Sequence, residues 1–308
     1  MGILDGKVIW VTGGGNGIGK DTALIAAKEG AKVVVNDLGG GFKGDDEGSA
    51  GPAEQVAAEI RSKGGKAFSN SDSVSSLKAM EALRDQTLKE FGGLHGVINP
   101  AGILRDAMFH KMTEFDWDKV IEVHLRGSYN VCRATVEHFR EQQDGAYALF
   151  TSTSGLIGNI GQTNYAAAKL GIMGLSRVLA MEGAKYGVRS NIIAPVAWTR
   201  MTQSVPIRDE AQAKRREQMA ATIRPDQPAK LAVALVSDLA KDVSGQIFGA
   251  RGDTIELYSQ PRAIMNINKE GGWTPEGIAR EAFGQMKEKF FPLSRSATSP
   301  EPAKAKAG

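Results

Sequence analysis

Short apolar runs alternate with amphipathic stretches along most of this chain. Residues 7–12 form a mostly apolar run suited to a buried strand, and a helical pattern follows it to about residue 29. A second apolar run covers residues 31–36, and the alternation continues to about residue 250 without an internal boundary. Strands that alternate with helices in this way predict an α/β fold built on a parallel sheet.

The same pattern predicts further helices, further strands and one long loop. The helices are expected at 52–63, 74–91 and 113–140, and the strands at 66–70, 94–99 and 146–151. Residues 39–51 are rich in glycine and charge, which predicts an exposed loop, either a plain solvated insertion or the rim of a ligand site. Near the end of the chain, Thr274 and Pro275 are typical of a helix N-cap and a first helical residue.

A glycine-rich turn separates the first predicted strand from the first predicted helix. Residues 12–19 read TGGGNGIG and fit the pattern T-G-x-x-x-G-x-G. A strand, a glycine turn and a helix together place a dinucleotide pyrophosphate against the helix N-terminus. Glycine is needed there because a side chain would block the close approach of the backbone. The segment therefore predicts a dinucleotide-binding site.

The second predicted strand ends at Asp37, eighteen residues after Gly19. A carboxylate at this place accepts hydrogen bonds from the ribose hydroxyls of NAD and repels the 2′-phosphate of NADP. Lys20 is the only basic residue close to the turn in sequence. The alternative is an aspartate that merely begins a turn. The pattern favours NAD as the cofactor.

Tyr165 and Lys169 lie one helical turn apart, and Ser152 precedes Tyr165 by thirteen residues. A charged lysine at about 5 Å and an effective dielectric of about 20 favours a phenolate by roughly 3 kcal/mol, a little over two pKa units. That shift would bring a phenol towards the range of a general acid or base. Ser152 would hold the oxygen of the substrate. The three residues predict proton transfer to or from an alcohol.

Composition and charge argue against several classes of protein. Apolar residues make up 42% of the chain, and of the net charge of +3, residues 294–308 carry +2. The rest is nearly neutral, so no electrostatic footprint for nucleic acid is expected. The single cysteine, Cys132, excludes an intrachain disulfide, and the four histidines lack metal-ligand spacing. Without a signal peptide or a membrane-spanning apolar run, a cytoplasmic enzyme with no membrane partner is expected.

Together these motifs resemble the short-chain dehydrogenase/reductase family over about residues 4–250. The resemblance implies a single Rossmann-type, doubly wound domain with about seven mostly parallel strands. It implies that Tyr165 donates or accepts the proton, that Lys169 lowers the pKa of Tyr165 and holds the ribose, and that Ser152 orients the substrate oxygen. The NAD contacts that it implies are Gly13, Asn16, Gly17, Ile18, Gly19, Asp37, Asp72, Ser73, Asn99, Ala101, Gly102, Tyr165, Lys169, Pro195 and Ala197.

The chain departs from the family pattern at three places. Pro100 replaces the second asparagine of Asn-Asn-Ala-Gly and removes one backbone N–H. His124 stands where the family has a catalytic asparagine, and either a proton-relay role or a packed helix histidine is open. Val196 replaces the glycine that usually follows Pro195, beside the nicotinamide.

Several segments are most similar to the (3R)-3-hydroxyacyl-CoA dehydrogenase units of peroxisomal multifunctional enzymes. They are 36–44, 101–106, 123–128, 161–165 and 200–203. The resemblance implies that NAD oxidises a (3R)-3-hydroxyacyl-CoA, or a steroid side-chain CoA ester, to the 3-oxo product. The alternatives are a hydroxysteroid dehydrogenase acting on free steroid alcohols and a non-catalytic NAD-sensing regulator. A homo-oligomer, dimer or tetramer, is expected from the family.

The domain organisation follows from the same resemblance. Residues 1–257 are expected to form the catalytic domain, 258–293 an extension packed on it or on a second subunit, and 294–308 a disordered tail. Residues 199–222 match the family's substrate lid. Their basic residues either meet the phosphates of CoA or form a solvated helix face; they are Arg200, Arg208, Lys214, Arg215 and Arg216.

Overall fold

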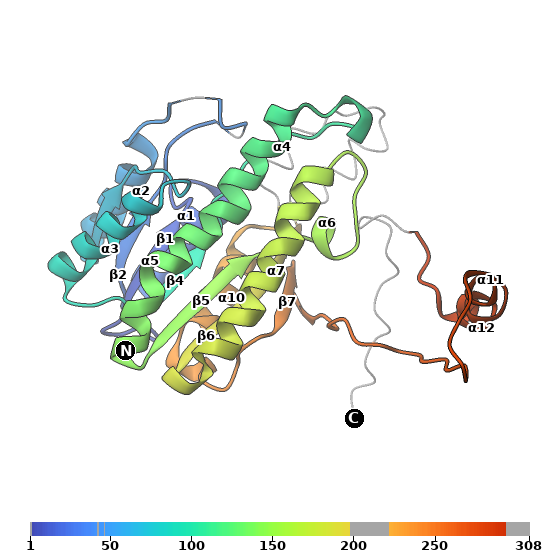
Figure 1. Ribbon diagram of the computed structural model, residues 1–308. Coiled ribbons are helices and arrows are strands. Elements are labelled where there is room, and N and C mark those ends of the chain that lie inside the picture. Colours follow the sequence, from blue (N-terminus) through green and yellow to red (C-terminus); the bar gives the residue numbers. More distant parts are fainter. Residues whose placement is uncertain (1, 42, 46, 198–221, 294–308) are drawn as a thin grey trace.

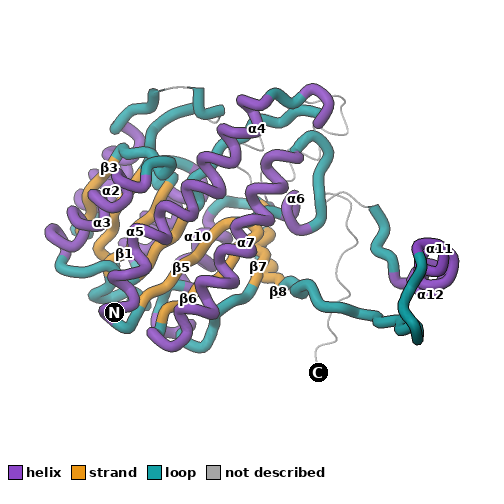
Figure 2. The backbone as a smooth tube through the Cα atoms, in the orientation of Figure 1, coloured by secondary structure: helices purple, strands orange, loops and turns teal. Residues whose placement is uncertain are grey.

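A sheet of eight strands runs through the centre of the molecule (Figure 2). The computed structural model describes residues 2–41, 43–45, 47–197 and 222–293. The strand order is β3-β2-β1-β4-β5-β6-β7-β8, in which β8 runs antiparallel to β7 and the other pairs are parallel. The strands are β1 (Val8–Thr12), β2 (Lys32–Asn36), β3 (Lys66–Asn70), β4 (Gly96–Asn99), β5 (Gly145–Phe150), β6 (Val188–Val196), β7 (Ile247–Arg251) and β8 (Thr254–Leu257).

This topology confirms the doubly wound α/β fold. The sheet has one strand more than the family resemblance implies, because the chain reverses after β7 and adds the four residues of β8 at the edge. Gly252, at a φ of 52°, makes this reversal possible. A strand this short carries too little apolar alternation to be predicted from sequence.

Alternate residues of the central strands contribute to two separate apolar cores, one on each face of the sheet. Val11 and Val33 belong to the first core, and Trp10 and Val34 to the second. Figure 1 views the sheet with α5 and α7 of the second helical layer in front. The first layer contains α1 (Gly17–Lys28), α2 (Gly51–Ser62) and α10 (Asp226–Leu235), and the second α3 (Leu77–Phe91), α5 (Gly127–Gln142) and α7 (Thr163–Gly183).

The helix predicted over 113–140 is interrupted by a π-turn. It consists of α4 (Glu114–Ile121), the π-turn η2 (Glu122–Arg126) and α5. Thr113 and Asp116 form a capping box at its start, which explains why the helix begins there. A π-turn inserts one residue into the helical repeat and is often found at functional sites. Here it contains His124.

The remaining short elements connect these layers. They are η1 (Phe109–Lys111), α6 (Thr153–Leu156), η3 (Ala184–Tyr186) and η4 (Asp238–Ala240). Cys132 is buried in the second core. Of the predicted lid at 199–222, only Thr222 lies within the described residues, and the predicted tail at 294–308 lies outside them.

Residues 258–293 form an arm that ends in a short helical unit. This unit contains α11 (Pro275–Gly277), the π-turn η5 (Ile278–Ala282), α12 (Phe283–Met286) and η6 (Lys287–Lys289). The predicted N-cap is confirmed, since Thr274 Oγ1 accepts a hydrogen bond from Gly277 N at 3.0 Å. Figure 1 shows the unit apart from the sheet and its helical layers, whereas the sequence predicts packing on that domain or on a second subunit. The division into domains stays a prediction.

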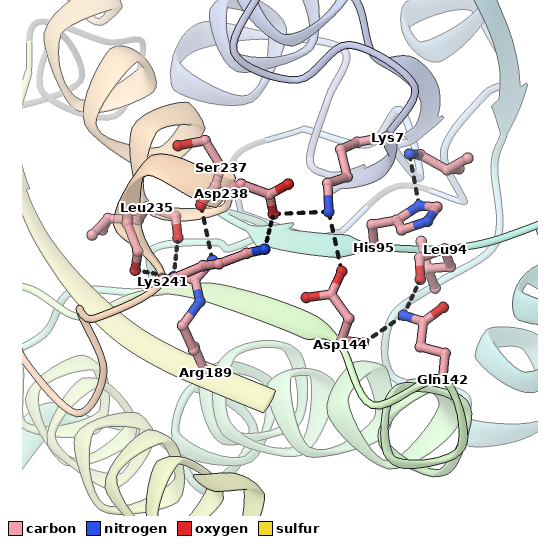
Figure 3. Close-up of polar contacts among 12 residues, drawn as sticks. Lys7, Leu94, His95, Gln142, Asp144, Arg189, Leu235, Ser237, Asp238 and Lys241 are labelled. Atoms are coloured by element: carbon pink, nitrogen blue, oxygen red, sulfur yellow. Dashed lines mark hydrogen bonds and ion pairs between the residues drawn. The ribbon is translucent and has the colours of Figure 1, made fainter. Parts of the chain in front are cut away.

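A polar network joins the amino ends of several strands (Figure 3). Lys7, which precedes β1, lies 3.1 Å from Asp144 before β5 and 2.9 Å from Asp238 of η4. His95, which precedes β4, accepts a hydrogen bond from Val8 N through Nδ1 at 3.0 Å. These contacts fix the starts of neighbouring strands relative to one another.

Arg189, at the start of β6, completes this network. Its side chain is buried, and its guanidinium donates hydrogen bonds to carbonyl groups at the end of α10 and in the segment that leads through η4. These carbonyls belong to Leu235, Ser237 and Ala240, at 2.7, 3.1 and 2.8 Å. A buried cation is stable here because backbone oxygens replace the water that it loses.

Candidate active site

A cavity of about 340 Å³ lies at the carboxyl ends of the central strands, opposite this polar network. Open α/β sheets bind ligands at this edge, next to the place where the strand order reverses. The cavity brings together most of the cofactor residues implied by the family resemblance. Those in its lining are Gly13, Asn16, Gly17, Ile18, Gly19, Asp37, Asp72, Ser73, Ala101, Gly102, Tyr165, Lys169 and Pro195.

The glycine turn forms a cradle of backbone at the start of α1. A Cβ on Gly13 would lie 2.9 Å from Ala101 Cα, and one on Gly19 would lie 2.0 Å from Gly13 O. Asn16 is the N-cap of α1, but its side chain makes no capping hydrogen bond. The first amides of this twelve-residue helix therefore face the cavity edge without a side-chain cap. A pyrophosphate fits such a cradle.

Asn99 fixes the loop that follows β4, which lines another side of the cavity. Its Oδ1 accepts a hydrogen bond from Thr12 Oγ1, and its Nδ2 donates to Ser128 Oγ at 2.9 Å. Ala101 N in turn donates to Thr12 Oγ1 at 3.3 Å. Asn99 is buried and lies outside the cavity lining, so in this structure it positions the loop. Ala197, also implied as a cofactor contact, is buried directly after β6 and likewise lies outside the lining.

The carboxylate of Asp37 is held at the end of β2 by two backbone amides. Gly15 N donates to Oδ2 at 2.8 Å, and Gly39 N donates to Oδ1 at 2.7 Å. Asp37 therefore begins a turn and also lines the cavity, and its contact with a ribose stays a prediction. Lys20 lies 3.6 Å from Glu59, on the side of α2.

The loop after β2 forms part of the cavity rim. Leu38, Gly40, Gly41 and Gly44 belong to the lining, which favours the rim over a plain solvated insertion. A cation fastens this loop to α4, because Arg105 pairs with Asp45 in the loop and with Asp116 on α4. The insertion is thus fixed beside the cofactor cradle.

Ser152, Tyr165 and Lys169 meet where β5 ends. Ser152 is the N-cap of α6, with its Oγ 3.1 Å from Ser154 N, and it forms a hydrogen bond with the hydroxyl of Tyr165. Lys169 Nζ lies 5.6 Å from the centre of the Tyr165 ring and donates to Phe150 O at 2.9 Å. The geometry expected from the spacing of the three residues is present.

Burial shifts the pKa values of Tyr165 and Lys169. It raises the pKa of Tyr165 to about 12 and lowers the pKa of Lys169 to about 7. The expectation that Lys169 brings the phenol towards neutrality is therefore wrong for the free protein. It assumed a fully charged lysine, whereas an amine with a pKa of about 7 is half uncharged near neutral pH. Proton release from Tyr165 is favoured at alkaline pH.

His124 is buried between Ile103, in the loop after β4, and Tyr165. Its ring meets the Tyr165 ring edge-on, with centroids 5.1 Å apart. Nε2 lies 2.8 Å from Ile103 O and 3.1 Å from Ile103 N, and Nδ1 has no hydrogen-bond partner among the described residues. Burial holds the pKa of His124 well below its ordinary value, so the ring is neutral. A Cβ on Gly102 would lie 2.1 Å from His124 Cε1, so this ring requires glycine opposite it.

The cavity also contains residues that sequence reasoning missed. Phe150 and Thr151 directly precede Ser152, and the rule that ligands bind at strand carboxyl ends would have found them. Lys119, Glu122 and Val123 line it from α4 and the π-turn. No sequence signal identifies these three, and for Glu122 and Val123 an α-helical repeat gives the wrong face because they lie in the π-turn.

Neither a metal centre nor a membrane span is found in the described ranges. They contain no group of three or more histidine, cysteine or carboxylate side chains able to hold an ion. Among them, no helix combines the length and the apolar composition needed to cross a bilayer.

Comparison with known proteins adds to this geometry. The family model of the short chain dehydrogenases matches residues 7–210. A short-chain type dehydrogenase/reductase of Mycobacterium tuberculosis is 55% identical over 204 residues, 66% of this chain and 71% of that protein. A solved short chain dehydrogenase from Mycobacterium avium superposes with a TM-score of 0.84 at 35% identity, covering 96% of this chain and 99% of the other.

Two further relatives carry more specific names. The mouse peroxisomal multifunctional enzyme type 2 is 49% identical over 217 residues, 70% of this chain. The match spans only 29% of the length of that enzyme. A hydroxyacyl-CoA dehydrogenase of Mycobacterium tuberculosis is 33% identical over 282 residues, 88% of this chain and 86% of that protein. The resemblance to the multifunctional enzymes is confirmed.

Proposed function

The chain belongs to the short-chain dehydrogenase/reductase family, as an oxidoreductase acting on CH–OH groups, and we propose that it oxidises (3R)-3-hydroxyacyl-CoA to 3-oxoacyl-CoA with NAD. The contact of Ser152, Tyr165 and Lys169 at the edge of a dinucleotide cradle carries this proposal. The name of one relative, the hydroxyacyl-CoA dehydrogenase of Mycobacterium tuberculosis, supports the acyl-CoA substrate.

NAD as the cofactor is supported by the surroundings of Asp37. Two amides hold its carboxylate at the cavity, where it would accept hydrogen bonds from ribose hydroxyls and repel a 2′-phosphate. Lys20, the basic residue nearest in sequence to the glycine turn, is turned towards Glu59. The remaining implied contacts, including Asn99 and Ala197, belong to the same proposal.

The protein side chains supply the proton chemistry of the proposed reaction. Bound NAD would accept the hydride from the alcohol carbon. Ser152 Oγ would hold the substrate oxygen, and the ionised Tyr165 would take its proton. Lys169, buried beside the phenol, would stabilise the phenolate and hold the ribose. His124 would keep the Tyr165 ring in place through its edge-on contact.

A substrate panel tests this function. The wild-type protein would be assayed for NAD reduction with (3R)- and (3S)-3-hydroxyacyl-CoA, a steroid side-chain CoA ester and a free steroid alcohol. We expect the (3R)-thioesters to give the highest kcat/KM. Preference for the free steroid alcohol would contradict the proposal and favour the hydroxysteroid dehydrogenase. Tyr165→Phe serves as the control for contaminating activity.

Exposed apolar side chains on the arm favour an assembly. We propose a homo-oligomer, since the arm exposes the apolar side chains of Phe283, Phe290 and Phe291, and we propose that the enzyme is cytoplasmic. Mass measurement in solution tests the assembly, and a monomer would contradict it.

A further inference from the structure

A carboxylate with no ion-pair partner among the described residues is joined through Gln162 and Ser154 to Ser152 at the active site. Asp106 accepts a hydrogen bond from Gln162 Nε2 at 2.8 Å. The neighbouring Arg105 does not neutralise it, because its guanidinium is engaged with Asp45 and Asp116. No cation among the described residues pairs with Asp106. Its negative charge is therefore available to act on a bound molecule.

The position of Asp106 is fixed by contacts on both sides. Ala107 N donates to Gly161 O at 2.9 Å, which joins the two loops. The buried amide of Gln162 has one orientation, because its Oε1 accepts hydrogen bonds from Ser154 Oγ at 2.7 Å and from Asn159 Nδ2 at 3.0 Å. Its N–H group must then point to Asp106. The carboxylate cannot turn away without breaking this chain.

The charge of Asp106 affects the pKa of Tyr165. Burial is the main cause of the raised pKa of Tyr165, and the charge of Asp106 raises that pKa further. The side chain of Asp106 reaches solvent, yet the protein around it desolvates the carboxylate and raises its own pKa. The other groups facing the phenol are the Ser152 hydroxyl, the Lys169 amine and the neutral His124 ring.

The two joined loops also expose apolar side chains. Met108 and Phe109, two and three residues after Asp106, are 49% and 69% exposed. Ile157 and Ile160, on the loop that contains Gly161, are 39% and 54% exposed. Such a surface suits an acyl or other apolar chain, whereas the charge within it disfavours an anion.

We propose that Asp106 selects against substrates that carry a free carboxylate near the reacting carbon. This inference rests on the proposed 3-hydroxyacyl substrate. In a 3-hydroxy acid the carboxylate is two bonds from the alcohol carbon, so it would approach Asp106 whenever the hydroxyl reaches Tyr165. Esterification, including thioesterification to CoA, removes that charge. Two like charges at about 6–8 Å and an effective dielectric of about 20–40 give a discrimination of roughly 10–100-fold.

Two small probes isolate the charge from the CoA contacts. They are methyl (3R)-3-hydroxybutyrate and (3R)-3-hydroxybutyrate, which share the acyl skeleton and both lack CoA. The ratio of kcat/KM for ester over acid would be measured at low salt for wild type and Asp106→Asn. Asparagine keeps an oxygen for Gln162 and removes the charge. We expect the ratio to fall about 10–100-fold, mainly because oxidation of the acid improves. The matched control is Glu137→Gln on the exposed side of α5, which should leave the ratio unchanged.

Two further readouts separate this role from a structural one. The ester:acid ratio of the wild type should fall as salt is added, because ions screen an exposed charge. The pH profile for ester oxidation should move to lower pH in Asp106→Asn, since a charge that opposes the phenolate is gone. An unchanged ratio in Asp106→Asn, or a wild-type ratio insensitive to salt, would overturn the proposal. If the wild type oxidises neither 3-hydroxyacyl-CoA nor the ester, the proposed function itself fails.

Discussion

The two ends of the parallel sheet carry charged side chains in opposite states. At the amino ends, Lys7 bridges two carboxylates, and the buried Arg189 donates its hydrogen bonds to backbone carbonyls, so both cations are engaged within the protein. At the carboxyl ends, Asp37 is held by amides alone and Asp106 by a neutral amide. Polar groups that are satisfied within the protein add stability, whereas those left available can bind and react. The sheet thus separates the groups that stabilise it from the groups that we propose to be catalytic.

The largest effect should come from the carboxyl end. Tyr165→Phe removes the proposed acid/base while keeping the ring that contacts His124. We expect kcat to fall about 10²–10⁴-fold with little change in NAD affinity or melting temperature. Steady-state kinetics and cofactor titration would measure both. Near-native turnover would show that Tyr165 does not transfer the proton.

The next effect belongs to the amino end. Arg189→Met leaves several buried carbonyls without a donor, so we expect the free energy of unfolding to fall by about 2–4 kcal/mol. Urea denaturation measures the loss, and KM for NAD should stay the same. Arg133→Met is the control, because Arg133 is on the surface of α5, 3.6 Å from Glu137. A large change in the KM for NAD with an unchanged free energy of unfolding would contradict the proposed difference between the two ends of the sheet.

Cofactor choice should respond to a single charge at the carboxyl end. In Asp37→Ala, the preference for NAD over NADP should shrink about 10–100-fold, since charged hydrogen bonds contribute about 1.5–3 kcal/mol. Asp37→Asn separates the two contributions to this effect. It removes the repulsion of a 2′-phosphate but keeps a side chain that can form hydrogen bonds with the ribose. The ratio of kcat/KM for the two cofactors is the measurement. Equal use of NAD and NADP by the wild type would contradict our interpretation of Asp37.

The smallest expected effect is a change in how stability depends on pH, and it involves a histidine at the amino ends of the strands. Burial holds the pKa of His95 below its ordinary value of 6.5, so the unfolded chain takes up a proton first. The contribution of His95 to stability is therefore complete above pH 6.5 and falls as the pH drops below it. His95→Asn offers an acceptor to Val8 N without titrating, and should lessen the loss of stability at low pH.

Denaturation curves at pH 5 to 8 would test this difference. His110→Asn is a matched control, because His110 is an exposed histidine of η1. Identical pH dependence in His95→Asn and the wild type would show that another group causes the loss at low pH.

Local patterns in the sequence determined the central fold and the cofactor cradle. The strand at 7–12, the glycine turn and Asp37 follow one another closely along the chain, and their spacing leaves little freedom in how they fold. The same holds for Tyr165 and Lys169, which one helical turn brings together. These predictions agree with the structure, in which both groups line one cavity.

Contacts between distant segments were decided only by the tertiary structure. The sequence cannot show that Asp106 meets Gln162, 56 residues away, or that the ring of His124 fits against Gly102. Nor can it show the extent of burial, which reverses the expected direction of the pKa of Tyr165. The physical reason is that spacing along a helix or strand fixes only near neighbours. Desolvation and long-range charge depend on everything that packs around a group.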